Sequence, residues 1–101
     1  MSNVDVLFLS KEDVVACAPT VQETRGIIES LFRAHVEGGV VMPTKSLVKP
    51  PAKYKGHWNG MPAYVQTPDG DVGGVKWLSS YLENMNKSGI PNIVAVIILN
   101  D

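Results

Sequence analysis

One lysine stands out because it lies inside an apolar segment. Lys76 is in the middle of Val72-Gly-Gly-Val-Lys-Trp-Leu78. A charged amine that is kept dry is costly, so this side chain either reaches solvent along its aliphatic stem or contacts an anion. In an extended strand, Gly74, Lys76 and Leu78 share one face. Because Gly74 has no side chain, this face either has room for a bound anion or is the solvated side of a sheet.

A second group of positive charges lies earlier in the chain. Four lysines occur within eleven residues that contain no acid, and three aromatic residues lie nearby (Lys45, Lys49, Lys53 and Lys55; Tyr54, His57 and Trp58). Such a segment is typical of a solvated loop, of a nucleic-acid surface, or of a carboxylate or phosphate site. Nine basic and ten acidic residues give the chain a net charge of −1, which favours the loop over nucleic acid.

Other catalytic signatures are missing from the sequence. Cys17 is the only cysteine, which excludes an internal disulfide, and it has no obvious base partner. His57 lacks a second ligand at metal spacing, so we expect no metal site. The sequence contains no Gly-x-Gly-x-x-Gly, the fingerprint of dinucleotide-binding loops. A lone thiol is typical of a reducing compartment, and we expect a cytoplasmic protein.

The first half of the chain has helical patterns. An apolar run at residues 6–9 is expected to form a short strand. Two capping boxes then predict the starts of two helices: Ser10 with Asp13, and Thr20 with Glu23. The first helix covers residues 11 to about 17 because Pro19 ends it. The second is amphipathic and ends at Gly38-Gly39; its apolar face is Ile28, Leu31, Phe32 and His35.

The second half has strand patterns. Residues 40–42 and 46–48 flank Pro43, which predicts an edge strand broken at that proline. Residues 57–66 predict a strand that is interrupted at Gly60-Met61-Pro62. A turn at Pro68-Asp69-Gly70 joins it to a returning strand over residues 72–80, which predicts an antiparallel hairpin.

The end of the chain is its most apolar part. Residues 81–91 are expected to be an irregular loop, and residues 92–99 a strand buried on both faces. Together these elements predict an α+β fold in which a short N-terminal strand and two helices pack on a mainly antiparallel sheet. Because the most apolar strand is also the last, we expect missing C-terminal segments or dimerisation to complete the sheet. One hundred and one residues suffice for one domain.

Composition excludes several further classes. Apolar residues make up 45% of the chain and charged residues 19%, which is ordinary for a globular domain. The longest apolar run, Ile93 to Leu99, is far shorter than the ~18 residues of a membrane helix. The N-terminus lacks the pattern of a secretory signal. We therefore expect neither a membrane nor a nucleic acid among the partners.

Several motifs, taken in order, resemble one known family. From about Leu7 to the end of the chain, their order and spacing are similar to the N-terminal part of the ornithine cyclodeaminase/mu-crystallin family. The motifs are Leu7-Phe-Leu-Ser-Lys-Glu-Asp-Val14, Glu29-Ser-Leu-Phe-Arg-Ala-His35, Gly38-Gly-Val-Val-Met-Pro-Thr-Lys45, Met61-Pro-Ala-Tyr64, Gly74-Val-Lys-Trp-Leu-Ser-Ser80 and Gly89-Ile-Pro-Asn-Ile-Val-Ala-Val-Ile-Ile-Leu-Asn-Asp101.

The resemblance assigns roles to four residues. It implies that Lys45 and Lys76 bind the substrate carboxylate, with Lys45 replacing a residue that is often arginine. Asn59 takes the place of a substrate-contacting acid. This replacement removes a negative partner for a distal ammonium on the substrate, which argues against ornithine as the substrate. Asn92 lies where the family often has a threonine near the nicotinamide. The resemblance implies no catalytic residue in this chain, since the family's catalytic aspartate lies further along.

The resemblance also implies an activity. Residues 1–101 would be an incomplete N-terminal substrate-binding and dimerisation domain, and a Rossmann domain absent from this chain would bind most of the NAD or NADP. The implied reaction is hydride transfer from the α-carbon of an amino acid, giving an imine, with cyclisation and ammonia loss in the cyclodeaminases. These residues alone are then expected to be inactive. The alternative is a non-enzymatic dimeric module that binds small anions.

Overall fold

A computed structural model describes residues 2–101, which form three α-helices, one short 3₁₀ helix and five strands. The expected α+β class is thereby confirmed. The chain divides into two compact units, one ending at Ser30 and one covering residues 31–101. Among the described residues, no helix has the length and apolar character needed to cross a membrane.

Both predicted capping boxes start helices at the expected places. Helix α1 (Lys11–Cys17) is capped by Ser10, whose hydroxyl accepts from the Asp13 amide at 3.1 Å while its own amide donates to the Asp13 carboxylate at 2.8 Å. These two hydrogen bonds lower the pKa of Asp13. Helix α2 (Val21–Val36) begins with the same reciprocal pair between Thr20 and Glu23. It ends near Gly38, whose φ of 84° is the left-handed conformation of a helix C-cap.

The expected N-terminal strand is wrong. Residues 6–9 belong to no strand, and Leu7 and Phe8 are 81% and 88% exposed. An apolar run becomes a strand only where a neighbouring strand accepts its backbone hydrogen bonds. The unit that ends at Ser30 offers none, since its described elements are helical.

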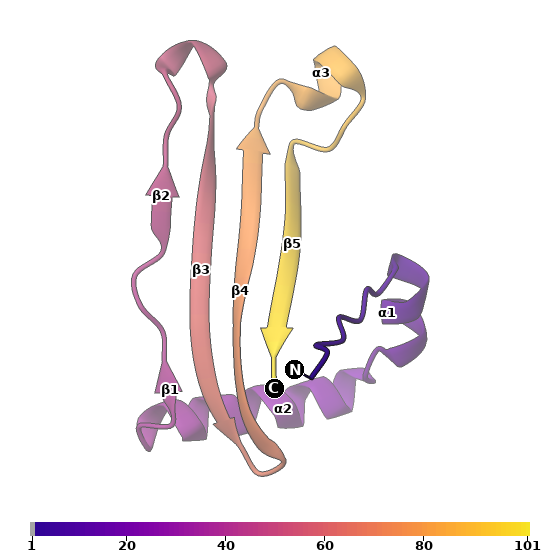
Figure 1. Cartoon of the computed structure of the whole chain (residues 1–101), viewed down its shortest axis with the longest axis vertical. Helices are drawn as coiled ribbons and strands as arrows, with labels where there is room; N and C mark the ends of the chain where they lie inside the picture. Colours follow the sequence, from indigo (N-terminus) through magenta and orange to yellow (C-terminus); the bar gives the residue numbers. More distant parts are fainter. Residues whose placement is uncertain (1) are drawn as a thin grey trace. The chain divides into compact units, whose positions relative to one another are not determined.

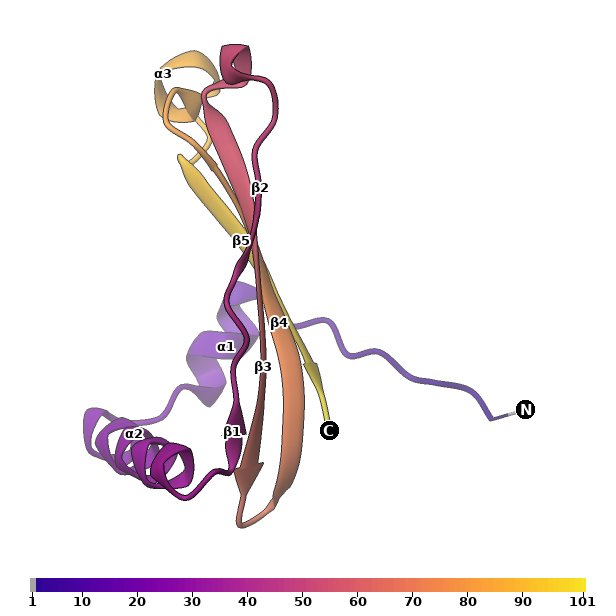
Figure 2. The same ribbon diagram turned by 90° about the vertical axis from the view of Figure 1, so that its left-hand side faces the viewer.

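The second unit is built on one antiparallel sheet, which forms a single twisted layer when seen edge-on (Figures 1 and 2). Strand β3 runs alongside β4 and β4 alongside β5, while β1 and β2 both pair with the outer edge of β3. The strands are β1 (Val40–Val41), β2 (Ser46–Val48), β3 (Gly56–Thr67), β4 (Gly70–Tyr81) and β5 (Ile93–Asn100). This confirms the predicted hairpin and the edge strand that is broken at Pro43.

The expected interruption at Gly60-Met61-Pro62 is also wrong, because β3 runs through it without a break. Pro62 lies opposite Val75 on β4. On its other side, β2 ends its pairing with β3 at Gly60 and β1 begins at Tyr64. Pro62 therefore lies opposite the gap between the two edge strands, where no partner needs its missing N–H.

The upper tip of the sheet in Figure 1 contains two short helices that the sequence patterns did not predict. A 3₁₀ helix, η1 (Ala52–Tyr54), precedes β3, and α3 (Asn84–Ser88) lies within the segment expected to be irregular loop. Helices of three and five residues are too short to carry an amphipathic pattern. Gly89, with φ 67°, ends α3 in the left-handed conformation.

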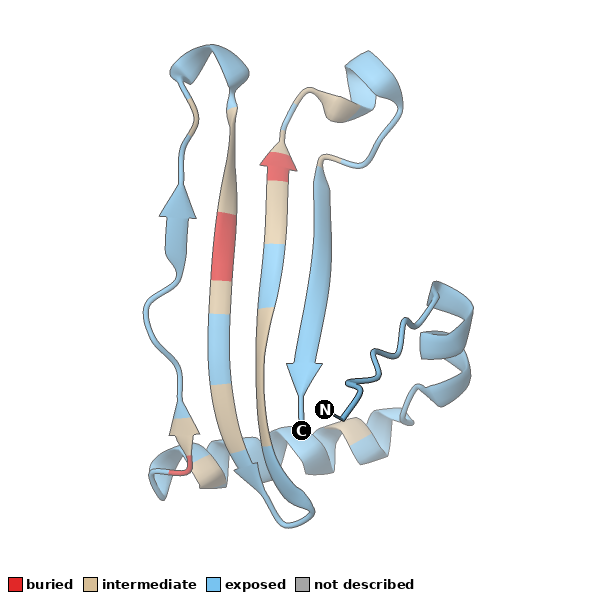
Figure 3. Ribbon diagram, in the orientation of Figure 1, coloured by how far each residue is buried: buried red, intermediate tan, exposed pale blue. Residues whose placement is uncertain are grey.

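Few of the described residues are buried, and they lie within β3, near the end of β4 and just before β1. No apolar side chain among the described residues is buried, whereas Asn59 and Ser80 are 4% and 7% exposed (Figure 3). Every residue of β5 is exposed, contrary to the expected burial on both faces. The strand is at the edge of the sheet, and among residues 2–101 nothing covers the apolar side chains on its two faces.

Candidate functional site

The sheet register places Lys76 on a defined face. Lys76 on β4 lies opposite Met61 on β3 and opposite Ile97 on β5. Residues directly opposite each other in an antiparallel sheet project to the same side, and side chains alternate along each strand. Gly74, Lys76 and Leu78 therefore share one face, as predicted, and we call it the Lys76 face. Lys76 itself is exposed.

The second predicted lysine lies at the start of the outer edge strand. Lys45 immediately precedes β2, whose Ser46 lies opposite Gly60 on β3. The pairing of β2 with β3 ends at Ser46, so Lys45 lies next to the sheet but outside its register. Both Lys45 and Lys76 are exposed.

Asn59 lies at the centre of the Lys76 face. It is two residues before Met61 on the same strand, between Leu47 on β2 and Leu78 on β4. The residue is only 4% exposed, and its Oδ1 has no hydrogen-bond partner among the described residues. A buried carbonyl oxygen without a donor costs about 1–3 kcal/mol. Asn59 is thus an enclosed polar residue that retains an unsatisfied acceptor among the described residues.

Gly74 shapes the surface beyond Lys76. A Cβ atom at this position would lie 2.5 Å from the carbonyl oxygen of Ile98, so the close approach of β4 and β5 requires glycine. A shallow depression of about 220 Å³ lies here, and its lining includes Met61, Lys76 and Leu99. A depression thus lies beside Lys76, as expected from Gly74, and its lining residues are mainly apolar.

A second depression lies at the upper tip of the sheet. It measures about 360 Å³ and its lining includes Lys49, Lys55, His57 and Ser80. His57 and Ser80 are directly opposite each other on β3 and β4, two residues beyond Asn59 and Leu78 on the Lys76 face. The polar end of that face therefore carries cations and neutral hydrogen-bonding groups.

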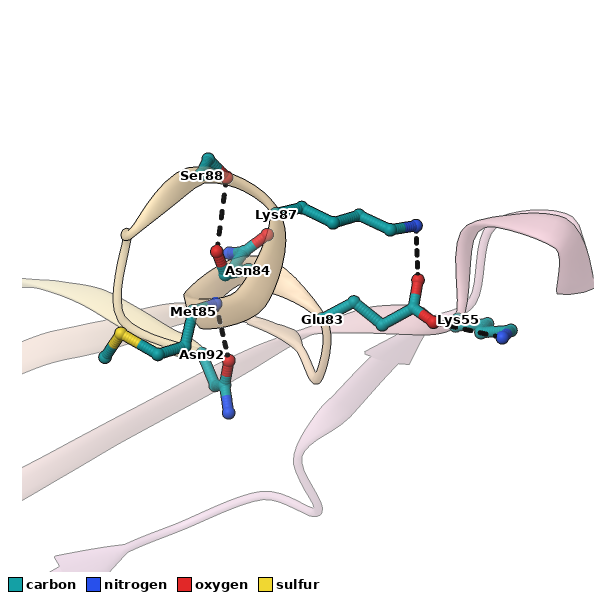
Figure 4. Close-up of polar contacts among 7 residues, drawn as sticks. All are labelled: Lys55, Glu83, Asn84, Met85, Lys87, Ser88 and Asn92. Atoms are coloured by element: carbon teal, nitrogen blue, oxygen red, sulfur yellow. Dashed lines mark hydrogen bonds and ion pairs between the residues drawn. The ribbon is translucent and has the colours of Figure 1, made fainter.

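The lysine run is partly neutralised by a residue that is distant in sequence. Glu83 accepts hydrogen bonds from Lys55 at 3.1 Å and from Lys87 at 2.5 Å (Figure 4). These contacts lower the pKa of Glu83. Lys53 lies over the Tyr54 ring, with its Nζ 4.9 Å from the ring centre. Only the register of the folded sheet brings Glu83 to this tip, so residue spacing gave no signal for it.

Asn92 lies apart from the other predicted site residues. Its Oδ1 accepts a hydrogen bond from the Met85 amide at 3.1 Å, and its amide nitrogen points away from α3 (Figure 4). Its backbone carbonyl accepts from the Tyr81 amide at 2.8 Å. Asn92 immediately precedes β5, whose first residue, Ile93, pairs with Ser80. It therefore anchors the α3 segment to the upper end of the sheet. The structure places Asn59 and Lys76 on one face, with Lys45 just before β2, and leaves Asn92 several residues further along the strands.

The described residues do not form a cradle for a dinucleotide pyrophosphate. Gly73 and Gly74 lie within β4, whereas such cradles are glycine-rich turns that lead into a helix. The amide nitrogen of Asn92 is a suitable donor for a carboxamide, but a single amide is not a dinucleotide site. Among residues 2–101, no group of three or more His, Cys, Asp or Glu side chains could hold a metal ion.

Comparison with protein families gives a match over nearly the whole chain. The model of the ornithine cyclodeaminase/mu-crystallin family matches residues 5–101. No curated protein matches the chain at the threshold applied.

Two solved structures are similar to the chain in both sequence and fold. One is an archaeal alanine dehydrogenase dimer with bound NAD, at 30% identity and a TM-score of 0.73; the match covers 90% of this chain and 26% of that protein. The other is the Thermococcus litoralis Δ1-pyrroline-2-carboxylate reductase in complex with NADH and L-proline, at 30% identity and a TM-score of 0.69; here the match covers 82% of this chain and 24% of that protein. The chain therefore spans about a quarter of the length of these relatives.

Proposed function

The chain belongs to the ornithine cyclodeaminase/mu-crystallin family, and from this premise we propose that it is the substrate-carboxylate-binding part of an NAD(P)-dependent enzyme that oxidises an amino acid or reduces an imino acid. The observation that supports the proposal is that Asn59 and Lys76 share one face of the sheet, with Lys45 immediately before the neighbouring strand β2. The similar alanine dehydrogenase structure contains bound NAD, and the similar reductase structure contains NADH and L-proline.

In this proposal Lys45 and Lys76 bind the carboxylate of the substrate. Two cations would fix both the position and the direction of the carboxylate, and through it the orientation of the adjacent α-carbon. A lysine contributes positive charge but lacks the planar, bidentate geometry with which arginine holds a carboxylate. Two lysines together would therefore be needed to fix the direction of the carboxylate. Asn59 Oδ1 would accept a hydrogen bond from an N–H of the same ligand.

NAD(P), when bound, accepts the hydride from the α-carbon of the amino acid, or returns it to the imine in the opposite direction. We propose that residues outside this chain bind most of the dinucleotide, with Asn92 contributing a contact through its amide nitrogen. Cyclisation with loss of ammonia is a narrower proposal, because it requires a second amine on the substrate. Asn59 supplies no negative charge for such an amine.

We also propose a homodimer. The apolar side chains of β5 are exposed on both faces among the described residues: Ile97 on the Lys76 face is 65% exposed, and Ile98 on the other face is 52% exposed. An edge strand of this kind is a surface that a second chain can cover. Sedimentation of the intact protein tests this, and a monomer at micromolar concentration would contradict it. The exposed thiol of Cys17 is consistent with the cytoplasm.

The decisive assay for the function uses the intact protein that carries this chain. NAD⁺ and NADP⁺ are each supplied with a panel of L-amino acids, and the reduced cofactor is followed by absorbance; the reverse direction uses cyclic imino acids with NADH or NADPH. We expect turnover that depends on both the amino or imino acid and the cofactor. Carboxylate binding without turnover in either direction would instead support a non-enzymatic anion-binding module.

A further inference from the structure

The depression of about 360 Å³ at the upper tip of the sheet combines basic side chains from three places in the chain; we call it the tip depression. Lys49 immediately follows β2, Lys55 immediately precedes β3, and His57 is the second residue of β3. All three line the tip depression, so the connection from β2 to β3 brings its first and last lysines to one concave surface. The carboxylate site proposed at Lys76 makes no use of these three residues.

The backbone at Lys55 adopts a conformation that glycine takes without strain. Its φ is 44°, and it is the one residue other than glycine in the described part of the chain with a positive φ. A lysine at this position costs conformational energy that a glycine would not. Strained positions of this kind occur preferentially where a side chain has a function. The Lys55 amine is therefore a candidate ligand-binding group.

Glu83 occupies only part of the hydrogen-bonding capacity of these lysines. It accepts from Lys55 at 3.1 Å and from Lys87 at 2.5 Å (Figure 4). A lysine ammonium has three N–H donors, so Lys55 retains two for a ligand while one is directed to Glu83. Lys49 has no hydrogen bond or ion pair with any of residues 2–101. Both amines can therefore contact an anion in the tip depression.

The lining of the tip depression suits a phosphate group on a small organic molecule. A phosphomonoester carries a charge of about −1.5 to −2 at pH 7, which two lysines can match, and its three free oxygens accept hydrogen bonds from several directions. Ser80, directly opposite His57, supplies a hydroxyl. Pro50, Ala52 and Leu82 form an apolar part of the lining. They can contact the organic part of the molecule.

We propose that the tip depression binds a phosphate group carried by a small organic molecule, with the phosphate between Lys49 and Lys55. A single concave site fits a small ligand better than the extended basic groove that a nucleic acid requires. The phosphate belongs either to a separate metabolite or to the dinucleotide cofactor, and the experiment below distinguishes these two sources. The inference does not depend on the proposed function.

The test measures the binding of propyl phosphate to the intact protein by calorimetry, at constant ionic strength because salt screens exposed charges. Lys49 is exposed, so Lys49→Met removes a charge without disturbing the packing. We expect this variant to bind propyl phosphate at least about tenfold more weakly than the wild type. The matched control is Lys53→Met, which should bind like the wild type, since Lys53 lies over the Tyr54 ring and does not line the tip depression. Butyrate, which has the same propyl group on a carboxylate, should lose no affinity in Lys49→Met.

Several outcomes would overturn the inference. They are no binding of propyl phosphate to the wild type, unchanged affinity in Lys49→Met, and a parallel loss for butyrate. An equal loss in Lys49→Met and Lys53→Met would also overturn it, because it indicates general attraction of anions to a basic surface. An oligonucleotide that binds more tightly than propyl phosphate and loses affinity in both variants would identify a nucleic-acid surface instead.

A titration in the presence of saturating NADP⁺ identifies the source of the phosphate. If the site holds a phosphate of the cofactor, NADP⁺ blocks the binding of propyl phosphate. If the site holds a separate metabolite, propyl phosphate binds as before. Calorimetry requires no catalysis, so absent turnover counts against the proposed function alone.

Discussion

Asn59 and Lys76 lie on neighbouring strands and on the same face of the sheet, two positions apart in register, since Lys76 is opposite Met61 and Asn59 precedes Met61 by two residues. Asn59 is buried and its Oδ1 has no hydrogen-bond partner among residues 2–101, whereas Lys76 is an exposed amine. One face of the sheet therefore carries a cation close to a buried amide.

Gly74 is predicted to be essential for the pairing of β4 with β5. In Gly74→Ala the new Cβ would lie 2.5 Å from the backbone oxygen of Ile98, which cannot move without disturbing the strand. We expect the free energy of unfolding to fall by about 1–3 kcal/mol, measured by urea denaturation of the intact protein. Gly73→Ala is the matched control, because a Cβ there has no atom within 4 Å. Equal stability of the two variants would show that the strands are not this close.

The tip of the sheet is predicted to loosen in acid. Hydrogen bonds from Lys87 and Lys55 lower the pKa of Glu83. A carboxyl group whose pKa is lowered by folding stabilises the fold at pH values above its unfolded pKa, which is ~4.3 for glutamate. That contribution is lost as the pH falls through the lower pKa of the folded state. We expect hydrogen exchange of the α3 amides to accelerate, relative to its intrinsic rate, over this acidic range.

Glu83→Gln should remove this pH dependence, because glutamine does not titrate. Glu12→Gln, a change at an exposed position in α1, serves as the control and should leave the α3 exchange profile unaltered. An acid-induced loosening of α3 that persists in Glu83→Gln would assign the effect to another group.

Asn92 is predicted to serve two separate functions through its two amide atoms. The Oδ1 atom accepts from the Met85 amide, so Asn92→Ala should accelerate hydrogen exchange of that amide. Asn92→Asp keeps the acceptor and should preserve α3. It loses the amide nitrogen, however, and we expect cofactor binding to the intact protein to weaken by up to about tenfold. Unchanged cofactor affinity in Asn92→Asp would exclude the proposed contact and leave Asn92 a structural residue only.

Much of this architecture could be predicted from local sequence signals. The capping boxes at Ser10 and Thr20 and the turn at Pro68-Asp69 depend on a few adjacent residues, and each is present in the structure. The face shared by Gly74 and Lys76 follows from the two-residue period of a strand. These features need no knowledge of the rest of the fold.

Features that depend on distant partners could not be predicted in this way. Pro62 continues a strand only because it lies opposite the gap between β1 and β2. Residues 6–9 have the composition of a strand but pair with no strand among residues 2–101. For the site, the resemblance named Asn59 and Lys76 separately, but only the register places them on one face. The unpartnered Oδ1 of Asn59 is visible only once the strands on either side are known.

Binding of the substrate carboxylate by Lys76 is tested most directly by the steady-state kinetics of Lys76→Met in the intact protein. Methionine keeps much of the side-chain volume and removes the charge. We expect kcat/KM for the amino acid to fall by about 10- to 100-fold with an unchanged circular dichroism spectrum. Lys76→Arg should restore part of the loss, and Lys53→Met, at the tip of the sheet, should resemble the wild type. Unaltered kcat/KM in Lys76→Met would contradict the account.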